Sequence, residues 1–472
     1  MSAELDRGGI AGHPRGLTTL FLTEFWERFS YYGMRAILFL FMVASTELGG
    51  LGFDTEKAAW IYGLYTGSVY LTAIPGGFVA DRLLGLRRAV LVGGILIATG
   101  HYTLAFHGLS TFYAGLILIV LGTGLLKPNI SSMVGQLYAQ DDDRRDAGFS
   151  IFYMGINLGA FVSPFLCGYL GQRIGWHWGF GAAGVGMTLG LLQYVLGGKR
   201  LGTVGFLREP PKEAGKLWLL VAVAVALLGT ALILSGQYRD YLIVGSAAVL
   251  FAWLLLKGAE NSIERKRIAA IALLFIFATL FWAGFEQAGS SLTLFADRIT
   301  HDQFFGHPSS WFQSVEPFFV ITLAPVFAWL WVRLGSRQPS SPGKFAIALS
   351  LLSVSFFLVA LASMLFEQQQ VNVSPWWLVG VYFLHALGEL SLSPVGLSMV
   401  TKLAPARILG FIMGIWFLTN ALGNFLAGSV AGYFDRLPLP QLFGAVGLVS
   451  LAATIVLALL VKPIRGLMSG VR

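Results

Sequence analysis

Six polar residues near the start of the chain recur at spacings that place them on one face of a helix. They are two carboxylates, two cations and two phenols: Glu24, Glu27, Arg28, Tyr31, Tyr32 and Arg35. Because residues three, four, seven and eight apart share a helix face, these side chains form a single polar stripe. Acids and bases that alternate along such a stripe can pair, and protonation or an incoming anion would break the pairs.

Four more ionisable residues interrupt apolar segments elsewhere: Lys127, Glu286, Glu316 and Glu389. A charge at the centre of a bilayer costs at least ~2.5 kcal/mol, so each is a candidate for binding or proton transfer. The alternative for any one of them is a structural ion pair that only locks two helices together. His385, one turn before Glu389, is expected to be a packed or hydrogen-bonded histidine rather than a proton relay.

The composition decides which class of protein holds these residues. The chain has 472 residues, of which 56% are apolar and 12% are charged, roughly half of the ~25% charge of a soluble chain. A soluble fold cannot bury so much apolar surface, so a polytopic membrane protein is predicted. The net charge of +8 is carried mainly by short loops, which favours the lipid bilayer as a partner and argues against nucleic acid.

Metal and nucleophile chemistry finds no support in the sequence. The single cysteine, Cys167, excludes an intramolecular disulfide, and no cluster of histidine and aspartate has the spacing of a metal or catalytic site. We therefore expect neither a metal nor a cofactor, and no enzyme.

Apolar segments long enough to cross a bilayer are the expected elements, since about 20 helical residues span the ~30 Å hydrocarbon layer. The fold class is all-α, with fourteen helices at 17–46, 56–84, 87–107, 111–138, 147–172, 177–197, 216–235, 241–257, 268–297, 309–334, 343–366, 375–402, 408–434 and 441–461. With the N-terminus in the cytoplasm, 24 of the 32 basic residues fall on the cytoplasmic side and five on the other. This asymmetry predicts that both termini are cytoplasmic.

Two pairs of segments repeat each other at identical spacing. Gly122, Pro128 and the Ser-Met-Val at 132–134 match Gly388, Pro394 and the Ser-Met-Val at 398–400. A Leu-Gly-x-Phe sequence followed by Gly-Tyr recurs in the fifth and thirteenth segments. The repeat predicts a six-helix bundle over 1–200, a cytoplasmic linker with two extra helices over 201–260, and a second bundle over 261–472. Parallel six-helix halves are the plan of the major facilitator superfamily.

Three motifs point to one family. Residues 24–33 read EFWERFSYYG, residues 152–159 read FYMGINLG, and residues 388–394 read GELSLSP. They resemble motifs of the proton-coupled oligopeptide transporters, and the GFVADRLLG loop at 77–85 resembles that of the whole superfamily. The resemblance implies proton-driven symport of di- and tripeptides into the cell by alternating access. It also implies a multi-pass plasma-membrane protein with the proton as coupling ion and no obligate protein partner.

The resemblance assigns roles to individual residues. Arg28 and Lys127 would bind the peptide carboxylate, and Glu389 and Asn157 its amino group. Together with the polar stripe and the isolated ionisable residues described above, the resemblance gives this substrate-binding set: Arg28, Tyr31, Tyr32, Arg35, Tyr70, Lys127, Asn157, Trp282, Glu316, Glu389, Ser393, Trp416 and Phe417. The proton-coupling set is Glu24, Glu27, Arg28, Arg35, Lys127 and Glu286, with Arg35 as the partner of Glu286. Charges at both ends suit a zwitterionic peptide.

Two departures from the family pattern bear on these roles. Animal members carry a histidine on the second helix where this chain has Gly63, so proton coupling is expected to rest on carboxylates. The family's usual Asn-Pro is here Glu316-Pro317. Two alternatives stay open: a relative that carries another solute, such as nitrate or a drug, and a non-transporting peptide sensor. A sensor would be expected to carry an extra soluble domain, and no loop is long enough for one.

Overall fold

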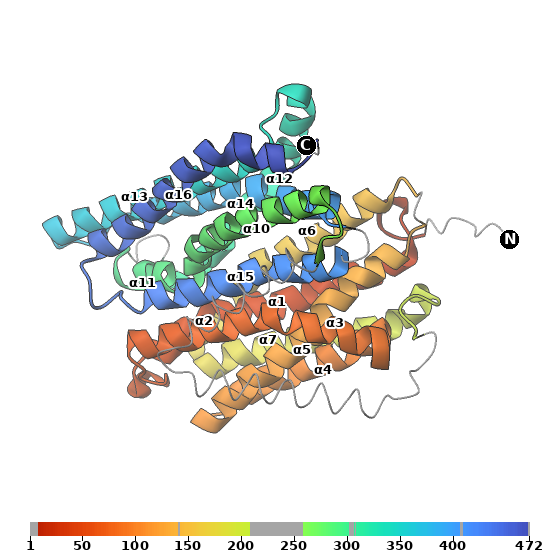
Figure 1. The fold of residues 1–472 in the computed structure, drawn as a ribbon. Coiled ribbons are helices and arrows are strands. Elements are labelled where there is room, and N and C mark those ends of the chain that lie inside the picture. Colours follow the sequence, from red (N-terminus) through yellow and green to blue (C-terminus); the bar gives the residue numbers. More distant parts are fainter. Residues whose placement is uncertain are drawn as a thin grey trace. The chain divides into compact units, whose positions relative to one another are not determined.

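The computed structural model describes residues 8–139, 142–207, 258–301, 306, 308–405 and 409–470. In this part of the chain the architecture is helical (Figure 1), and a single bridge between Thr300 and Val373 is its one β-type contact. Eight helical segments there are long and apolar enough to cross a membrane. The predicted all-α membrane fold is confirmed. The expected helices at 216–235 and 241–257 lie outside the described residues, so the count of fourteen stays a prediction.

The described residues form two compact units, of which the first comprises those within Met1–Gly52 and Ser68–Ala231. Its helices are α1 (Arg15–Val43), the end of α2 (Thr55–Leu71), α3 (Ala73–Val79), α4 (Leu86–Leu104), α5 (Leu109–Gln136), α6 (Arg145–Ser163) and α7 (Trp176–Leu196). Wider π-helical turns at Ala80–Leu84, Pro164–Gly168 and Leu170–Ile174 extend α3 and α6. α1 packs on α6 and α7, α4 packs on α5 and α7, and α3 packs on α5.

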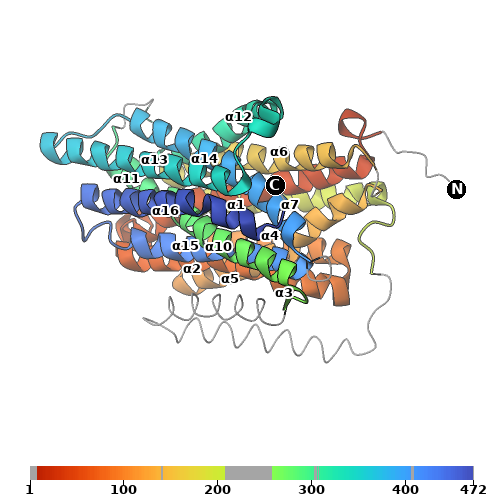
Figure 2. The ribbon, with the colours of Figure 1, turned by 45° about the horizontal axis from the view of Figure 1, so that its top comes forward.

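The second unit comprises Phe53–Gly67 and the described residues within Leu232–Arg472. Its helices are the start of α2, α10 (Ser262–Phe285), α11 (Ser291–Arg298), α12 (Val315–Leu334), α13 (Ser341–Gln369), α14 (Trp376–Leu403), α15 (Leu409–Ala431) and α16 (Leu439–Leu467). α13 and α16 lie side by side in both ribbon views (Figures 1 and 2). α10 packs on α15 and α16, and α14 packs on α12 and α13.

The packing inside the second unit repeats that inside the first, pair for pair. The pairs α1–α6, α1–α7, α3–α5, α4–α5 and α4–α7 correspond in chain order to α10–α15, α10–α16, α12–α14, α13–α14 and α13–α16. The helices that echo each other in sequence, α5 and α14, both carry an internal proline, Pro128 and Pro394. The sequence repeat therefore reflects a repeated packing scheme.

Three expected helices are interrupted. The segment 56–84 divides at Thr72, just before Pro75, whose ring nitrogen has no hydrogen to donate to the preceding turn. The segment 268–297 divides after Phe285 into a 3-10 turn, Glu286–Gly289, and Ser290 then leaves helical geometry with φ −131° and ψ −94°. The segment 309–334 opens with a 3-10 turn, Ser309–Ser314, before α12 begins.

The residues ahead of α1 are tied to the loop between α5 and α6. His13 Nδ1 lies 2.8 Å from the Tyr138 hydroxyl, and Arg144 donates from Nη1 to the carbonyl of Gly12 at 3.0 Å. Arg144 also binds both carboxylate oxygens of Asp142, and these hydrogen bonds hold the pKa of that carboxyl below its usual value. Burial raises the pKa of Tyr138 to about 12.

Gly63 lies where the start of α2 crosses α15. A Cβ added to Gly63 would lie 3.0 Å from the carbonyl oxygen of Asn424 and 3.1 Å from the Cα of Gly428. A Cβ added to Gly428 would lie 2.7 Å from the carbonyl oxygen of Ala59. This close approach explains why 53–67 pack with the second unit, although the expected first bundle contains them. A side chain at position 63 would require the backbone of α15 to move by a few tenths of an ångström.

We expect Gly428→Ala to destabilise the protein, although alanine in a helix interior is usually favoured over glycine by about 1 kcal/mol. The added methyl meets backbone atoms that cannot move aside, and overpacking of this kind costs roughly 1–3 kcal/mol. Gly444→Ala in α16 is the matched control, because nothing lies within 4 Å of a Cβ there. Apparent melting temperatures in detergent test the pair. Gly428→Ala melting at or above Gly444→Ala would contradict the close crossing.

Candidate functional site

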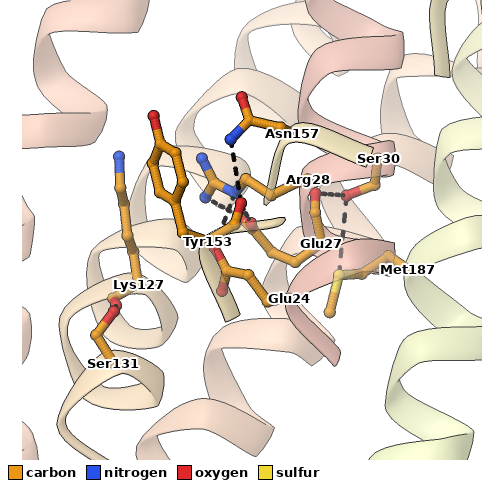
Figure 3. A network of polar contacts seen from close by, with 9 residues as sticks. All are labelled: Glu24, Glu27, Arg28, Ser30, Lys127, Ser131, Tyr153, Asn157 and Met187. Atoms are coloured by element: carbon orange, nitrogen blue, oxygen red, sulfur yellow. Dashed lines mark hydrogen bonds and ion pairs between the residues drawn. The ribbon is translucent and has the colours of Figure 1, made fainter. Parts of the chain in front are cut away.

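The polar stripe on α1 lies inside the first unit as a compact ion-pair network (Figure 3). Arg28 donates from Nη2 to Oε1 of Glu27 at 2.6 Å and from Nε to its second carboxylate oxygen. The same Nε lies 3.2 Å from Oε1 of Glu24. All three side chains are almost completely buried, with 2%, 0% and 2% exposed for Glu24, Glu27 and Arg28. The acid–base pairing predicted from spacing is therefore present.

Two glycines of α6 allow α1 to pack closely beside this network. A Cβ added to Gly159 would lie 2.9 Å from the Cβ of Arg28, and one added to Gly155 would meet the ring of Phe21 at 2.9 Å. Both glycines belong to the FYMGINLG motif, whose Asn157 is also buried. Asn157 donates to the carbonyl of Tyr153, one turn earlier, at 3.1 Å. The motif thus places an amide next to the Arg28 network (Figure 3).

The aromatic residues of the stripe cover the guanidinium groups. The Cζ of Arg28 lies 5.3 Å from the ring centre of Tyr31 and 5.9 Å from that of Tyr32. Arg35 lies over the other end of the stripe, 5.8 Å from the Tyr32 ring centre. Cation–π contacts of this kind strengthen when water is excluded. Arg28 therefore lies between the two carboxylates and the rings of Tyr31 and Tyr32.

Lys127 of α5 brings a second cation to the network. Its Nζ lies 4.0 Å from the ring centre of Tyr70, which is a predicted substrate-binding residue. Figure 3 shows the Lys127 side chain in the same region as the Glu24, Glu27 and Arg28 side chains. In the first unit, the structure therefore brings together the predicted residues of α1, α2, α5 and α6. The region contains two acidic and two basic residues: Glu24, Glu27, Arg28 and Lys127.

In the second unit, Glu286 is the first residue of the 3-10 turn that separates α10 from α11. Only 3% of the surface of Glu286 is exposed. Trp282, one turn earlier, packs closely against α15. A Cβ added to Gly423 of α15 would lie 2.4 Å from the Cβ of Trp282. The change from α-helix to 3-10 turn therefore lies directly at a buried carboxylate. Such breaks, where they line a cavity, are typical of ion and substrate sites in transporters.

The two aromatic residues predicted on α15 face different surroundings. Trp416 is buried against Phe345, with ring centres 6.1 Å apart, and a Cβ added to Gly396 would lie 2.6 Å from its ring. Phe417 is 38% exposed. Neighbours in a helix point about 100° apart, so these two residues do not share one face.

Glu389 and Ser393 lie one turn apart on α14, and both are half-buried. Glu316 is the second residue of α12, not two turns into a helix as its expected segment placed it, because residues 309–314 form a separate 3-10 turn. α12 packs on α14 through Val320, one turn after Glu316. A carboxylate in the first turn of a helix is stabilised by the helix dipole.

Sequence reasoning missed the aromatic residues that support the predicted ones. Phe285 follows Trp282 by three residues, and their rings meet edge to face at 5.2 Å. Phe345 supports Trp416 from α13, 71 residues away in the chain. A stripe of Phe281, Trp282 and Phe285 at helical spacing was a usable signal for the first of these. No local pattern identifies the second.

Comparison with known proteins identifies the family. A sequence model of the POT family matches residues 87–447. The chain belongs to the POT family. The peptide transporter YePEPT of Yersinia enterocolitica subsp. palearctica serotype O:3 is 42% identical, over 97% of this chain and 96% of that protein. A di-/tripeptide transporter of Lactococcus lactis subsp. cremoris is 38% identical, over 98% of both. A crystal structure of peptide transporter POT in complex with sulfate has a TM-score of 0.91 and 43% identity, covering 99% of this chain and 98% of that one.

Membership of the POT family confirms three predictions made from the motifs. The chain is a transporter and not an enzyme, because the family and its curated relatives are transporters. It is a multi-pass membrane protein, as its apolar helices indicate. The family inferred from the motifs, the proton-coupled oligopeptide transporters, was correct.

We expect Arg28→Met in this POT-family protein to lower the free energy of unfolding by about 3–5 kcal/mol, because it removes the guanidinium that pairs directly with two buried carboxylates. Adding Glu27→Gln should restore part of that loss. Arg298→Met is the matched control: its pair with Asp435 is largely exposed and should contribute about 1 kcal/mol or less. Apparent melting temperatures of the four proteins test this. Equal losses from Arg28→Met and Arg298→Met would rule out a buried network.

Proposed function

We propose that this chain is a proton-driven symporter that carries di- and tripeptides into the cell by alternating access. The substrate class is supported by relatives named as peptide and di-/tripeptide transporters, which align over nearly their whole length. The observation that carries the mechanism is the buried cluster of Glu24, Glu27 and Arg28, with Lys127 in the same region (Figure 3). It combines cations that suit a carboxylate ligand with acids that can hold protons.

Charge balance links the two events. With both acids ionised, Glu24 and Glu27 offset Arg28 and Lys127, so the cluster is neutral. A peptide carboxylate that binds Lys127 and Arg28 adds one negative charge to a buried site. Uptake of a proton by Glu24 or Glu27 restores neutrality, and thereby weakens that acid's hold on Arg28. Proton binding and carboxylate binding therefore favour each other, as linkage requires.

The other predicted residues receive roles in the same scheme. Glu389 and Asn157 bind the peptide ammonium group. Glu286 carries a proton and pairs with Arg35. The remaining predicted residues contact peptide side chains or support the charged groups: Tyr31, Tyr32, Tyr70, Trp282, Glu316, Ser393, Trp416 and Phe417. Recognition of the two termini with aromatic surroundings permits many side chains. We also propose fourteen spanning helices and cytoplasmic termini, which the distribution of lysine and arginine favours.

The test is uptake of radiolabelled alanyl-alanine by purified protein in liposomes. An inward proton gradient should drive accumulation, and a protonophore should abolish it. Peptide binding without uptake would indicate a sensor. Failure of peptides to bind or to enter, with gradient-driven uptake of nitrate or a drug, would indicate a changed substrate. Exchange of peptide with no response to the gradient would refute proton coupling.

We expect Lys127→Ala and Glu389→Ala each to abolish measurable uptake while the protein stays folded. Each removes a charge proposed to bind one peptide terminus. Loss of such a contact costs about 2–5 kcal/mol, roughly 30-fold or more in affinity. Lys402→Ala and Glu367→Ala are matched controls, because they make the same chemical changes at exposed positions of the helices. Uptake by either test variant equal to that of its control would disprove the two-ended clamp.

We expect Glu316→Asn, which restores the family residue, to remain active with a displaced pH optimum. The reason is that one carboxylate fewer competes for protons near the peptide ammonium group. Glu316→Ala should bind peptide more weakly. The measurements are a pH profile of uptake and a peptide titration. If Glu316 only stabilises the start of α12, the pH profile of Glu316→Asn will match wild type and Glu316→Ala will bind peptide normally.

A further inference from the structure

His385 is a buried titratable residue to which the proposed transport mechanism gives no role. Only 1% of its surface is exposed, on α14 one turn before Glu389. Its Nε2 lies 3.0 Å from the hydroxyl oxygen of Ser355 on α13. That hydroxyl donates its one hydrogen to the carbonyl of Leu352 at 2.6 Å. Ser355 must therefore accept from His385, and the ring proton is on Nε2.

The other ring nitrogen fixes the charge of His385. Nδ1 is buried and has no hydrogen-bond partner within the described part of the chain. A protonated imidazole would carry an N–H there with no acceptor, at the full cost of a buried unsatisfied donor. The Nε2 proton leads only to Ser355, whose own hydrogen is committed to a carbonyl. The ring is therefore a neutral donor and a dead end for proton transfer.

Two phenylalanines enclose the imidazole from neighbouring helices. The Phe285 ring lies 5.5 Å from it at 30°, and the Phe356 ring lies 5.9 Å from it at 40°. Phe285 is the last residue of α10, directly before Glu286 and the 3-10 turn. Gly388 also brings α14 close to α10, because a Cβ there would lie 3.0 Å from the ring of Phe281.

We propose that His385 is a positioning residue that sets where α10 ends, and so holds the carboxylate of Glu286 and the ring of Trp282 in place. Its hydrogen bond to Ser355 anchors the imidazole to α13, and the anchored ring fixes Phe285. Phe285 in turn contacts Trp282 edge to face at 5.2 Å. This inference rests on the proposed function, in which Glu286 carries a proton and Trp282 contacts the peptide.

The experiment compares gradient-driven uptake with peptide counterflow in liposomes, per folded protein. His385→Ala removes both the ring and the anchor. Its maximal gradient-driven rate should fall by about tenfold, within the 5–150-fold range of typical coupling, while counterflow falls much less. His385→Phe keeps a ring beside Phe285, and should retain coupled uptake within about threefold. His101→Ala, the matched control, removes another fully buried histidine, from α4, and should leave the ratio of the two rates unchanged.

Each outcome supports or overturns the inference. If His385→Phe loses gradient-driven uptake as completely as His385→Ala, the imidazole takes part in proton transfer and the positioning role is wrong. If His385→Ala keeps the wild-type ratio of the two rates, Glu286 does not depend on it and the inference is also wrong. Ser355→Ala should lower coupled uptake no further than His385→Phe does, and it should have no additional effect in His385→Phe, because the hydrogen bond is already gone. Absence of peptide uptake by wild type would instead refute the proposed function.

Discussion

The arrangement of the first unit depends on the ion pairs that the buried guanidinium of Arg28 makes with Glu24 and Glu27. Two carboxylates bind it from the same helix, and the polar stripe cannot face lipid because each charge there would be desolvated without compensation. α1 must therefore lie inside its unit, with α6 and α7 packed around it. This packing requires the two glycines of the FYMGINLG motif, because only a residue without a side chain lets α6 approach Arg28 so closely.

Neutrality of this cluster has a further implication for how it responds to ligands. A buried group of two acids and two bases has no strong preference for cation or anion, yet any added charge upsets it. In a medium of low dielectric constant such an imbalance is felt strongly. In the proposed mechanism, the cluster is neutral with both acids ionised and responds to a single added proton or carboxylate. A surface ion pair such as Arg298–Asp435 lacks this property, because water screens it.

Local spacing predicted the first unit better than the second. The residues that pair with Arg28 lie one and four positions away, so helix periodicity was enough to find them. Long apolar runs also predicted the positions of the helices. They did not predict the breaks at Thr72 and after Phe285, because hydropathy carries no information on backbone hydrogen bonds. Partners across α13 and α14, such as Ser355 and His385, lie 30 residues apart. Their pairing depends on which helices pack together, and the sequence carries no local signal for that.

The contact of Gly63 with Gly428 limits which residues either position can carry. A Cβ added to either glycine would lie 3.1 Å or less from backbone atoms of the other helix. A larger residue at one position therefore requires the backbones of α2 and α15 to move apart, and such a movement would also relieve the crowding at the other position. Substitutions at 63 and 428 should therefore not be additive in their effect on stability, because they strain the same contact.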